Sequence, residues 1–167
     1  MHLQQKKITM RKIRNISVFS LVLVLMYMIA CNDNRVFHEV KEFDNYRWNK
    51  SEKLDFEFNI EQANKAYELW LNLRYIHGFP YKYLHLLISI TEPDGKVKTN
   101  ELTIQIITDA KEYIGDGAGS YWDLDYPIPE YQFNKKGKYK ITVEHAMKDD
   151  VLNLIGELGV LVNKKKE

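Results

Sequence analysis

The chain has 167 residues, with 24 Lys and Arg against 23 Asp and Glu, and a formal net charge of +1. Five of the basic residues precede position 31, so removal of residues 1–30 leaves 19 basic and 23 acidic residues, a net charge of −4. A mildly acidic protein lacks the basic footprint of a nucleic-acid binder, so no nucleic-acid partner is expected. The single cysteine excludes a disulfide within the chain.

The first 30 residues have the organisation of a signal peptide for export. Basic residues between Lys6 and Arg14 precede an apolar run from Ile16 to Ala30, which is too short to cross a bilayer comfortably as a helix. Residues Met28 to Cys31 resemble the lipobox of bacterial lipoproteins. The resemblance implies cleavage before Cys31, a diacylglycerol thioether on its sulfur and an acyl chain such as palmitate on its amine. The alternatives are an ordinary secretory cleavage site beside a leftover cysteine, or an uncleaved anchor helix.

The lipid defines the expected organisation of the mature chain. Two or three acyl chains hold a protein durably on a membrane, at ~0.8 kcal/mol per buried methylene, whereas one chain holds it only marginally. We therefore expect a protein that sits on a bilayer through its lipid without spanning it. The predicted parts are a signal peptide (1–30), a lipidated N-terminus with a short spacer (31–35) and a single domain (36–167).

The first half of the mature chain alternates apolar and polar residues, which is typical of strands with one buried face. Residues 36–43 fit either a strand or one to two helical turns. Strands are predicted at 54–60, 67–75 and 83–90. Only a loop with Gly78 and Pro80 separates the last two, so these strands are expected to pair with each other.

The second half begins with the sharpest turn of the sequence. In "TEPDGK", Pro93, Asp94 and Gly95 predict a tight turn that joins residues 83–91 to a strand continuing through 101–106. Residues 115–133, rich in Gly and Pro, are expected to form an extended loop with a short edge strand. Alternation resumes at 137–147, and a final strand is predicted through Leu158, Val160 and Val162.

Seven or so short strands separated by turn signals predict an all-β fold. The favoured architecture is an antiparallel β-sandwich with immunoglobulin-like topology, and a small barrel is the alternative.

Few residues suggest catalysis or metal binding. Asp116, Asp123 and Asp125 cluster, but their spacing does not match an EF-hand loop, and ordinary turn residues are expected. Asp123 and Asp125 share a strand face and could form a glycosidase pair only across a cleft, so catalysis by them is not expected. No catalytic residue, cofactor or metal is predicted, because the chain also lacks a nucleophile motif and histidines at metal-ligand spacing.

Aromatic residues provide the remaining functional signal. Tyr121, Trp122, Tyr126 and Tyr131 crowd residues 115–133, where they would pack the loop onto the sheet, anchor a protein interface or stack against sugar rings. If the strands at 67–75 and 83–90 pair, Trp70 and Leu87 form an apolar outer patch, which would mark a partner site. The candidate partner-binding residues are Trp70, Leu87, Tyr121 and Trp122.

Several stretches together resemble one family. They are "CNDNRVFHEVKEFDNYRWNKSEKLDFEFNI", "LWLNLRYIHGFPYKYLHLLISITEPDGKVKT", "YIGDGAGSYWD" and "GKYKITVEHAMKDD". In this order they are similar to the gliding motility lipoprotein GldH family of Bacteroidota, over essentially the whole mature chain. The resemblance implies an envelope lipoprotein that is an accessory to gliding motility, whose machinery is linked to type IX secretion. It implies no catalytic residues.

The sequence thus predicts a non-enzymatic envelope lipoprotein that binds other gliding or secretion proteins. The expected location is the outer membrane, lipid-anchored on its periplasmic face, because no dense acidic cluster follows Cys31. The alternative function is glycan binding through Tyr121, Trp122 and their neighbours.

Overall fold

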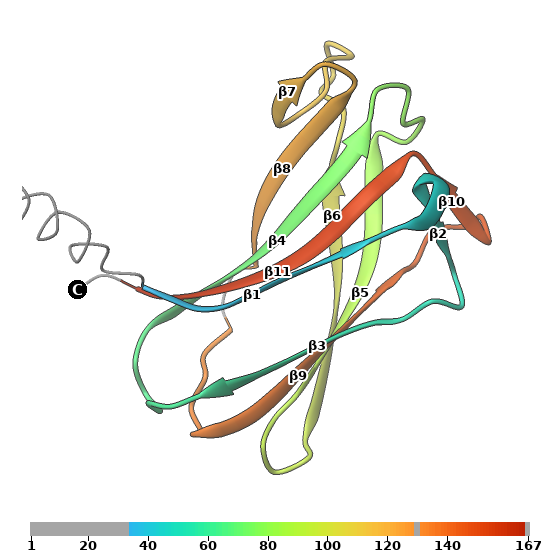
Figure 1. Cartoon of the computed structure of the whole chain (residues 1–167). Coiled ribbons are helices and arrows are strands. Elements are labelled where there is room, and N and C mark those ends of the chain that lie inside the picture. Colours follow the sequence, from blue (N-terminus) through green and yellow to red (C-terminus); the bar gives the residue numbers. More distant parts are fainter. Residues whose placement is uncertain (1–33, 129–130, 166–167) are drawn as a thin grey trace, which may run out of the picture. The chain divides into compact units, whose positions relative to one another are not determined.

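The computed structural model describes residues 34–128 and 131–165, and strands dominate this part of the chain (Figure 1). Its one helical element is the short 3-10 turn η1 (Asp44–Tyr46). The strands are β1 (Arg35–Glu42), β2 (Arg47–Asn49), β3 (Leu54–Ile60), β4 (Tyr67–Ile76), β5 (Tyr83–Thr91), β6 (Val97–Gln105), β7 (Asp116–Ala118), β8 (Tyr121–Ile128), β9 (Gly137–His145), β10 (Val151–Asn153) and β11 (Ile155–Lys164).

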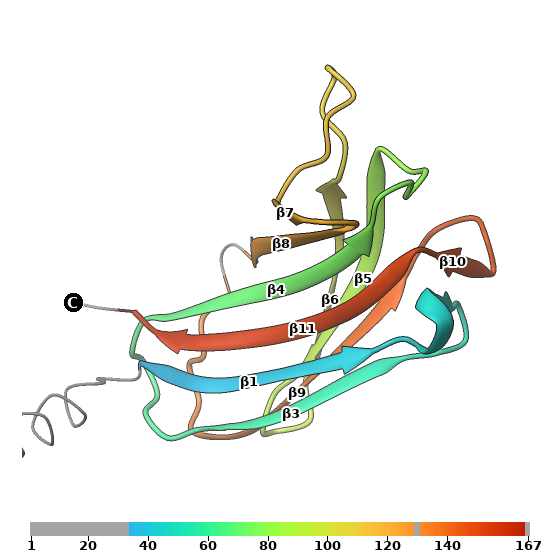
Figure 2. The ribbon, with the colours of Figure 1, turned by 45° about the horizontal axis from the view of Figure 1, so that its top comes forward.

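The strands form two main antiparallel sheets that lie in separate layers (Figures 1 and 2). One sheet has five strands in the order β1-β11-β4-β8-β7, and the other has four in the order β3-β9-β5-β6. The predicted all-β antiparallel sandwich is therefore confirmed. The ambiguous stretch 36–43 forms most of β1, because Phe37 to Glu42 pair with β11 after an irregularity at Val36.

The core lies between the two layers and consists of the residues that alternation placed inward. The buried inward residues of β3, β4, β5, β9 and β11 include Leu54, Phe56, Phe58, Ile60, Leu69, Leu71, Leu73, Leu84, Leu86, Ile88, Ile90, Ile141, Val143, Leu158, Val160 and Val162. Aromatic rings join the layers at one side, where Phe37 of β1 stacks on Phe58 of β3 at 5.1 Å between ring centroids. Burial of this apolar surface is the main force that holds the sheets together.

The two strands that we expected to pair lie in different sheets. β4 is hydrogen-bonded to β11 and β8, whereas β5 is hydrogen-bonded to β9 and β6. The segment between them crosses from one layer to the other and is anchored by Phe79, whose side chain is buried in the core. The prediction was wrong because alternation shows which face of a strand is buried but not which sheet the strand joins.

The expected long loop at 115–133 is mostly a hairpin. β7 and β8 pair around Gly119, whose φ of 62° is the left-handed geometry that a tight turn requires. All eight residues of β8 pair with β4. Pro127 is tolerated because β7 reaches only to Asp123, so the rest of β8 has a neighbour on one side only.

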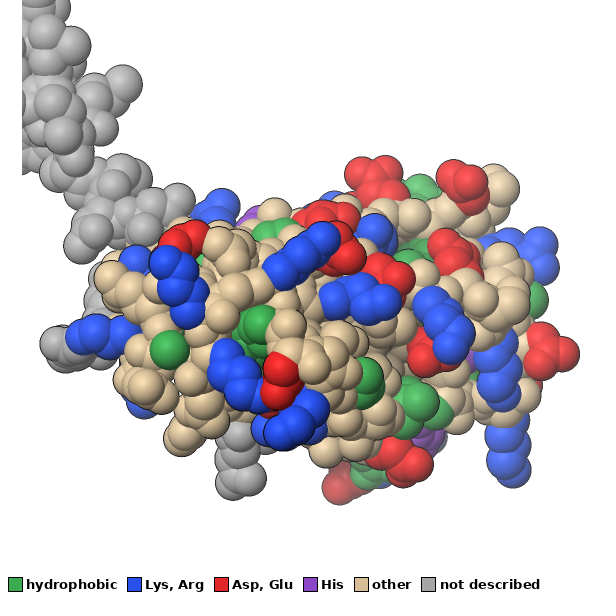
Figure 3. Space-filling view, turned by 90° about the horizontal axis from the view of Figure 1, so that it is seen from below, with side chains coloured by type: hydrophobic (Ala, Val, Ile, Leu, Met, Phe, Trp, Pro, Cys, Tyr) green, Lys and Arg blue, Asp and Glu red, His purple; other side chains and the backbone are tan. Residues whose placement is uncertain are grey.

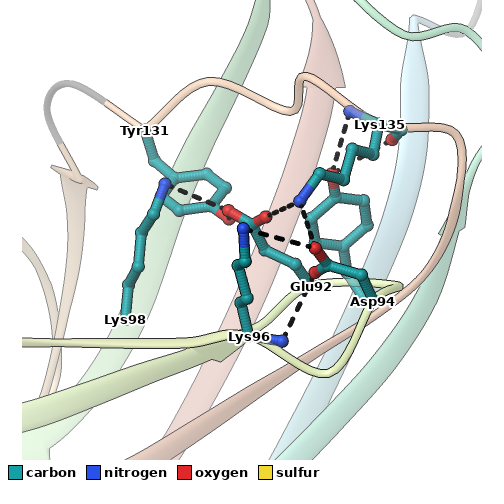
Figure 4. A network of polar contacts seen from close by, with 7 residues as sticks. Glu92, Asp94, Lys96, Lys98, Tyr131 and Lys135 are labelled. Carbon is teal, nitrogen blue, oxygen red and sulfur yellow. Dashed lines mark hydrogen bonds and ion pairs between the residues drawn. The ribbon is translucent and has the colours of Figure 1, made fainter.

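The predicted turn at 91–96 joins β5 to β6 and is held by a polar network (Figure 4). Figure 4 shows Lys98, Tyr131 and Lys135 converging on Glu92, whose carboxylate lies 2.6 Å from Lys135 Nζ and 3.0 Å from Lys98 Nζ. Hydrogen bonding from Lys135 lowers the pKa of Glu92, and burial raises the pKa of Tyr131. The network fastens the β5–β6 turn to the segment between β8 and β9, so we assign it a structural role.

A two-stranded ribbon of β2 and β10 closes one end of the sandwich. Trp48 and Leu152 face each other in this ribbon and are fully buried. The indole of Trp48 stacks on Phe43 at 5.0 Å, meets His145 edge-on at 5.2 Å and donates a 2.9 Å hydrogen bond to the carbonyl oxygen of Glu52. The ribbon is therefore part of the core.

The signal peptide, Cys31 and the start of the spacer lie outside the described residues. Their predicted roles stay predictions. Among residues 34–128 and 131–165, none of the helical structure is long or apolar enough to cross a membrane.

Candidate interaction surface

The four candidate partner-binding residues do not form one site. Trp70 and Tyr121 project from the outer face of the five-stranded sheet, on β4 and β8. Leu87 lies on the outer face of the other sheet, opposite Glu101 and Glu144. Trp122 points inward, where its ring packs 5.4 Å from that of Tyr113. The Trp70 and Leu87 patch is thus absent, because β4 and β5 are not neighbours.

The aromatic residues of 115–133 mostly pack rather than project. Trp122, Tyr126 and Tyr131 are partly buried against the core. Tyr121 is the exception, with 39% of its surface exposed and its hydroxyl 3.0 Å from that of Tyr46. Tyr46 is itself 43% exposed, so this pair forms an accessible aromatic group.

The strand register arranges the outer face of the five-stranded sheet in rows across β1, β11, β4 and β8. The first row is mainly apolar and contains His38, Leu161, Trp70 and Pro127. The second row contains Val40, Gly159, Asn72 and Asp125. The third row is charged and contains Glu42, Glu157, Arg74 and Asp123, with Asp116 of β7 beyond it. Residues within a row interact directly across the strands.

Arg74 organises the charged row. Its guanidinium donates two hydrogen bonds to Asp123, with Nε to Oδ1 at 2.7 Å and Nη2 to Oδ2 at 3.0 Å, and a third to Glu157 at 2.7 Å. These bonds, the one to Asp123 foremost, raise the pKa of Arg74. Arg74 therefore stays charged and holds two carboxylates that would otherwise repel each other.

A depression of about 200 Å³ lies where the rows meet, lined by His38, Val40, Asn72, Leu73, Arg74, Asp123, Leu124, Asp125 and Glu157. Gly159 is needed here, because a Cβ would lie 2.8 Å from Val40 Cγ2 and 3.1 Å from the carbonyl oxygen of Glu39. Asn72 donates a 2.6 Å hydrogen bond to Asp125, which orients the amide. Its Oδ1 is buried and has no hydrogen-bond partner among the described residues.

The depression is lined by three carboxylates and includes the pair Asp123 and Asp125, the glycosidase candidates. Two of them, Asp123 and Glu157, are bound to Arg74, and Asp125 accepts from Asn72. Groups engaged in this way hold the sheet together and are not poised as a free acid and base. Within the described part of the chain, no three His, Cys, Asp or Glu side chains are placed to hold a metal ion.

The outer face of the four-stranded sheet has a different chemistry. Three of its four carboxylates pair with lysines, with Lys138 2.6 Å from Glu57, Lys53 2.9 Å from Glu144 and Lys140 3.7 Å from Asp55, and the fourth carboxylate belongs to Glu101. Hydroxyl groups fill the space between, as between Ser89 and Thr99. Figure 3 shows the molecule from below, which is the side where β3 and β9 lie in Figure 1. Basic and acidic side chains intermix on this side. This surface is typical of a solvated face.

Sequence reasoning missed most residues of the outer face of the five-stranded sheet. His38, Val40, Gly159 and Leu161 were not singled out, although the alternation in 158–162 marks Gly159 and Leu161 as outward-facing. Their meeting with Trp70 depends on the pairing of the two terminal strands, and no local pattern in the sequence indicates that pairing.

Fold and surface together define a small antiparallel β-sandwich with one distinctive sheet face. The chain belongs to the GldH lipoprotein family, whose model matches residues 35–162. Membership of a lipoprotein family implies a membrane-anchored protein of the cell envelope. The resemblance seen in the sequence is thereby confirmed.

Two relatives extend over most of the chain. One is the "Gliding motility lipoprotein GldH" of Flavobacterium johnsoniae, 26% identical over 163 residues, which cover 92% of this chain and 99% of that protein. The other is the "Gliding motility lipoprotein GldH homolog" of Christiangramia forsetii, 28% identical over 133 residues, which cover 79% of this chain and 81% of that protein. Among solved structures, a carbohydrate-binding module specific for non-crystalline cellulose matches 76% of this chain and 70% of its own at 9% identity and a TM-score of 0.41. So distant a match carries no argument about function.

Proposed function

We propose that this protein is a non-enzymatic accessory component of the gliding motility machinery associated with type IX secretion, and that it acts through protein–protein contacts. The observation that carries the proposal is the family match across residues 35–162, together with relatives named gliding motility lipoproteins. The half-buried Trp70, set beside Leu161 and Pro127 on an outer sheet face, supports the contact role. Tryptophan is enriched at the centres of protein interfaces.

The contact role is tested by affinity capture after crosslinking in intact cells. Trp70→Ser is expected to reduce the recovered partners at least fivefold, because it removes the largest apolar side chain of the first row. Leu87→Ser is the matched control, since it removes an apolar side chain from the other outer face and should leave capture unchanged. Equal capture by both variants and the unmodified protein would contradict the proposed contact role.

We further propose that Cys31 carries the lipid and that the domain lies on the periplasmic face of the outer membrane. The sequence around Cys31 supports the lipid, and the family supports an envelope location. Labelled palmitate should be incorporated into the native protein and not into Cys31→Ser. Protease added to intact cells should leave the domain whole, and its digestion would place the domain on the cell exterior.

Glycan binding is the second candidate. The accessible pair Tyr46 and Tyr121, with ring centroids 6.4 Å apart and the Arg74 guanidinium 6.0 Å from the Tyr121 ring, is the observation that favours it. Aromatic rings beside hydrogen-bonding groups suit sugar rings. Titration with neutral oligosaccharides should then give saturable fluorescence quenching that Tyr121→Ala abolishes.

A further inference from the structure

The charge of the outer face of the five-stranded sheet is unbalanced. Five carboxylates occupy the second and third rows and the strand beyond them, and they belong to Glu42, Asp116, Asp123, Asp125 and Glu157. Among the described residues of these rows, Arg74 is the single Lys or Arg. Asp116 lies directly opposite Asp123 in the register, a placement of like charges that costs stability. These two rows and β7 therefore carry more carboxylates than the one arginine among them can neutralise.

The outer face of the four-stranded sheet differs in its charge pairing. There, Lys138, Lys140 and Lys53 each lie within 4 Å of a carboxylate. That face therefore holds three lysines for four carboxylates, counting Glu101, whereas the second and third rows with β7 hold one arginine for five. The unneutralised face is also the one that carries the apolar row with Trp70.

The depression between the rows is lined by hydrogen-bond acceptors. The buried Oδ1 of Asn72 has no donor among the described residues, and its orientation is set by the bond that the amide nitrogen gives to Asp125. The carboxylates of Asp125 and Glu157 line the same depression. The Asn72 oxygen is closed to a ligand in this conformation, but the two carboxylates accept hydrogen bonds strongly from charged donors. The occupant should therefore bring donors and positive charge.

We propose that this face docks an extended segment of a partner protein that presents Lys or Arg side chains beside an apolar one. The inference rests on the proposed contact function and specifies the chemistry of the partner. Trp70, Asn72 and Arg74 lie two residues apart along β4, so the rows repeat at the two-residue spacing of an extended chain. A fitting segment places an apolar side chain on the first row and Lys or Arg two and four residues away, over the depression and the third row. Neutral sugar hydroxyls supply donors but leave the charge unbalanced.

Binding of defined peptides to the full-length protein in nonionic detergent tests the inference. The first probe is the nonapeptide Lys-Thr-Lys-Thr-Leu-Thr-Lys-Thr-Lys, whose lysines share a face with the central Leu in either chain direction. The second is Thr-Lys-Thr-Lys-Leu-Lys-Thr-Lys-Thr, which has the same composition but places its lysines on the opposite face. At low salt the first peptide should bind at least fivefold more tightly than the second, and its affinity should fall as salt rises.

Charge reversal on the protein provides the matched control. Glu42→Lys combined with Asp116→Lys changes exposed residues of the docking face and should weaken binding of the first peptide at least tenfold. Glu101→Lys combined with Glu112→Lys makes the same change in net charge elsewhere on the exposed surface and should weaken binding of the first peptide less than threefold. Circular dichroism verifies that both variants are folded.

Each other outcome overturns the inference. Equal affinity for the two peptides, or equal loss in the two double variants, would mean general attraction to an acidic protein. Absence of peptide binding, or saturable binding of neutral oligosaccharides that Trp70→Ser abolishes, would favour a different ligand. If Trp70→Ser still reduces partner capture in cells while the peptides do not bind, the contact function stands and the cationic partner is wrong.

Discussion

Removal of the indole of Trp48 should lower the free energy of unfolding of the domain substantially. The side chain is fully buried between Phe43, His145 and the ribbon of β2 and β10, and it makes one hydrogen bond. Trp48→Ala removes that bond and leaves a large cavity, so the free energy of unfolding should fall by about 4 kcal/mol. Trp48→Phe keeps an aromatic ring but loses the bond, worth about 1 kcal/mol, and part of the packing, so about 2 kcal/mol is expected.

Urea unfolding followed by far-ultraviolet circular dichroism measures these changes in a chain that begins after Cys31. Trp70→Ala is the matched control, because the same change at a half-buried site on an outer sheet face should cost less than about 1.5 kcal/mol. If Trp48→Ala costs no more than Trp70→Ala, the ribbon does not belong to the core. A loss confined to one step of a two-step transition would show that the ribbon unfolds independently of the sheets.

Two further predictions concern the same domain. Burial lowers the pKa of His145 below its ordinary value near 6.5, and neither ring nitrogen has a partner among the described residues. The unfolded chain thus binds the proton more readily, so stability is complete above about pH 6.5 and is lost as the pH falls below it. His145→Phe should flatten the dependence of unfolding free energy between pH 7.5 and 5.5, and an unchanged slope contradicts this. Gly159→Ala should lower the free energy of unfolding by about 1–3 kcal/mol, because its Cβ clashes with Val40. Adding Val40→Ala should recover part of this loss. An unchanged urea midpoint for Gly159→Ala would show that the strand shifts to accommodate the methyl group.

The limits of sequence reasoning are clearest on β4 and β8. The alternation in 67–75 correctly separated inward Leu71 from outward Trp70, because the side-chain period of a strand is a local property. It could not assign β4 to a sheet, and the assumption that neighbours in sequence pair gave a false link to Leu87. On β8, Pro127 argued against a strand, but the open edge beyond β7 accepts a residue without an amide hydrogen.

The sequence by itself determined the family and the all-β class, because the two-residue alternation and the ordered family stretches are local patterns along the chain; the leader and the lipid on Cys31 stay predictions. The sequence alone did not reveal how the outer face of the five-stranded sheet is composed. Val40 from the first strand, Gly159 from the last and Asn72 between them become neighbours only when the terminal strands pair beside β4. Such pairing depends on the packing of the whole core, which no single stretch of residues encodes.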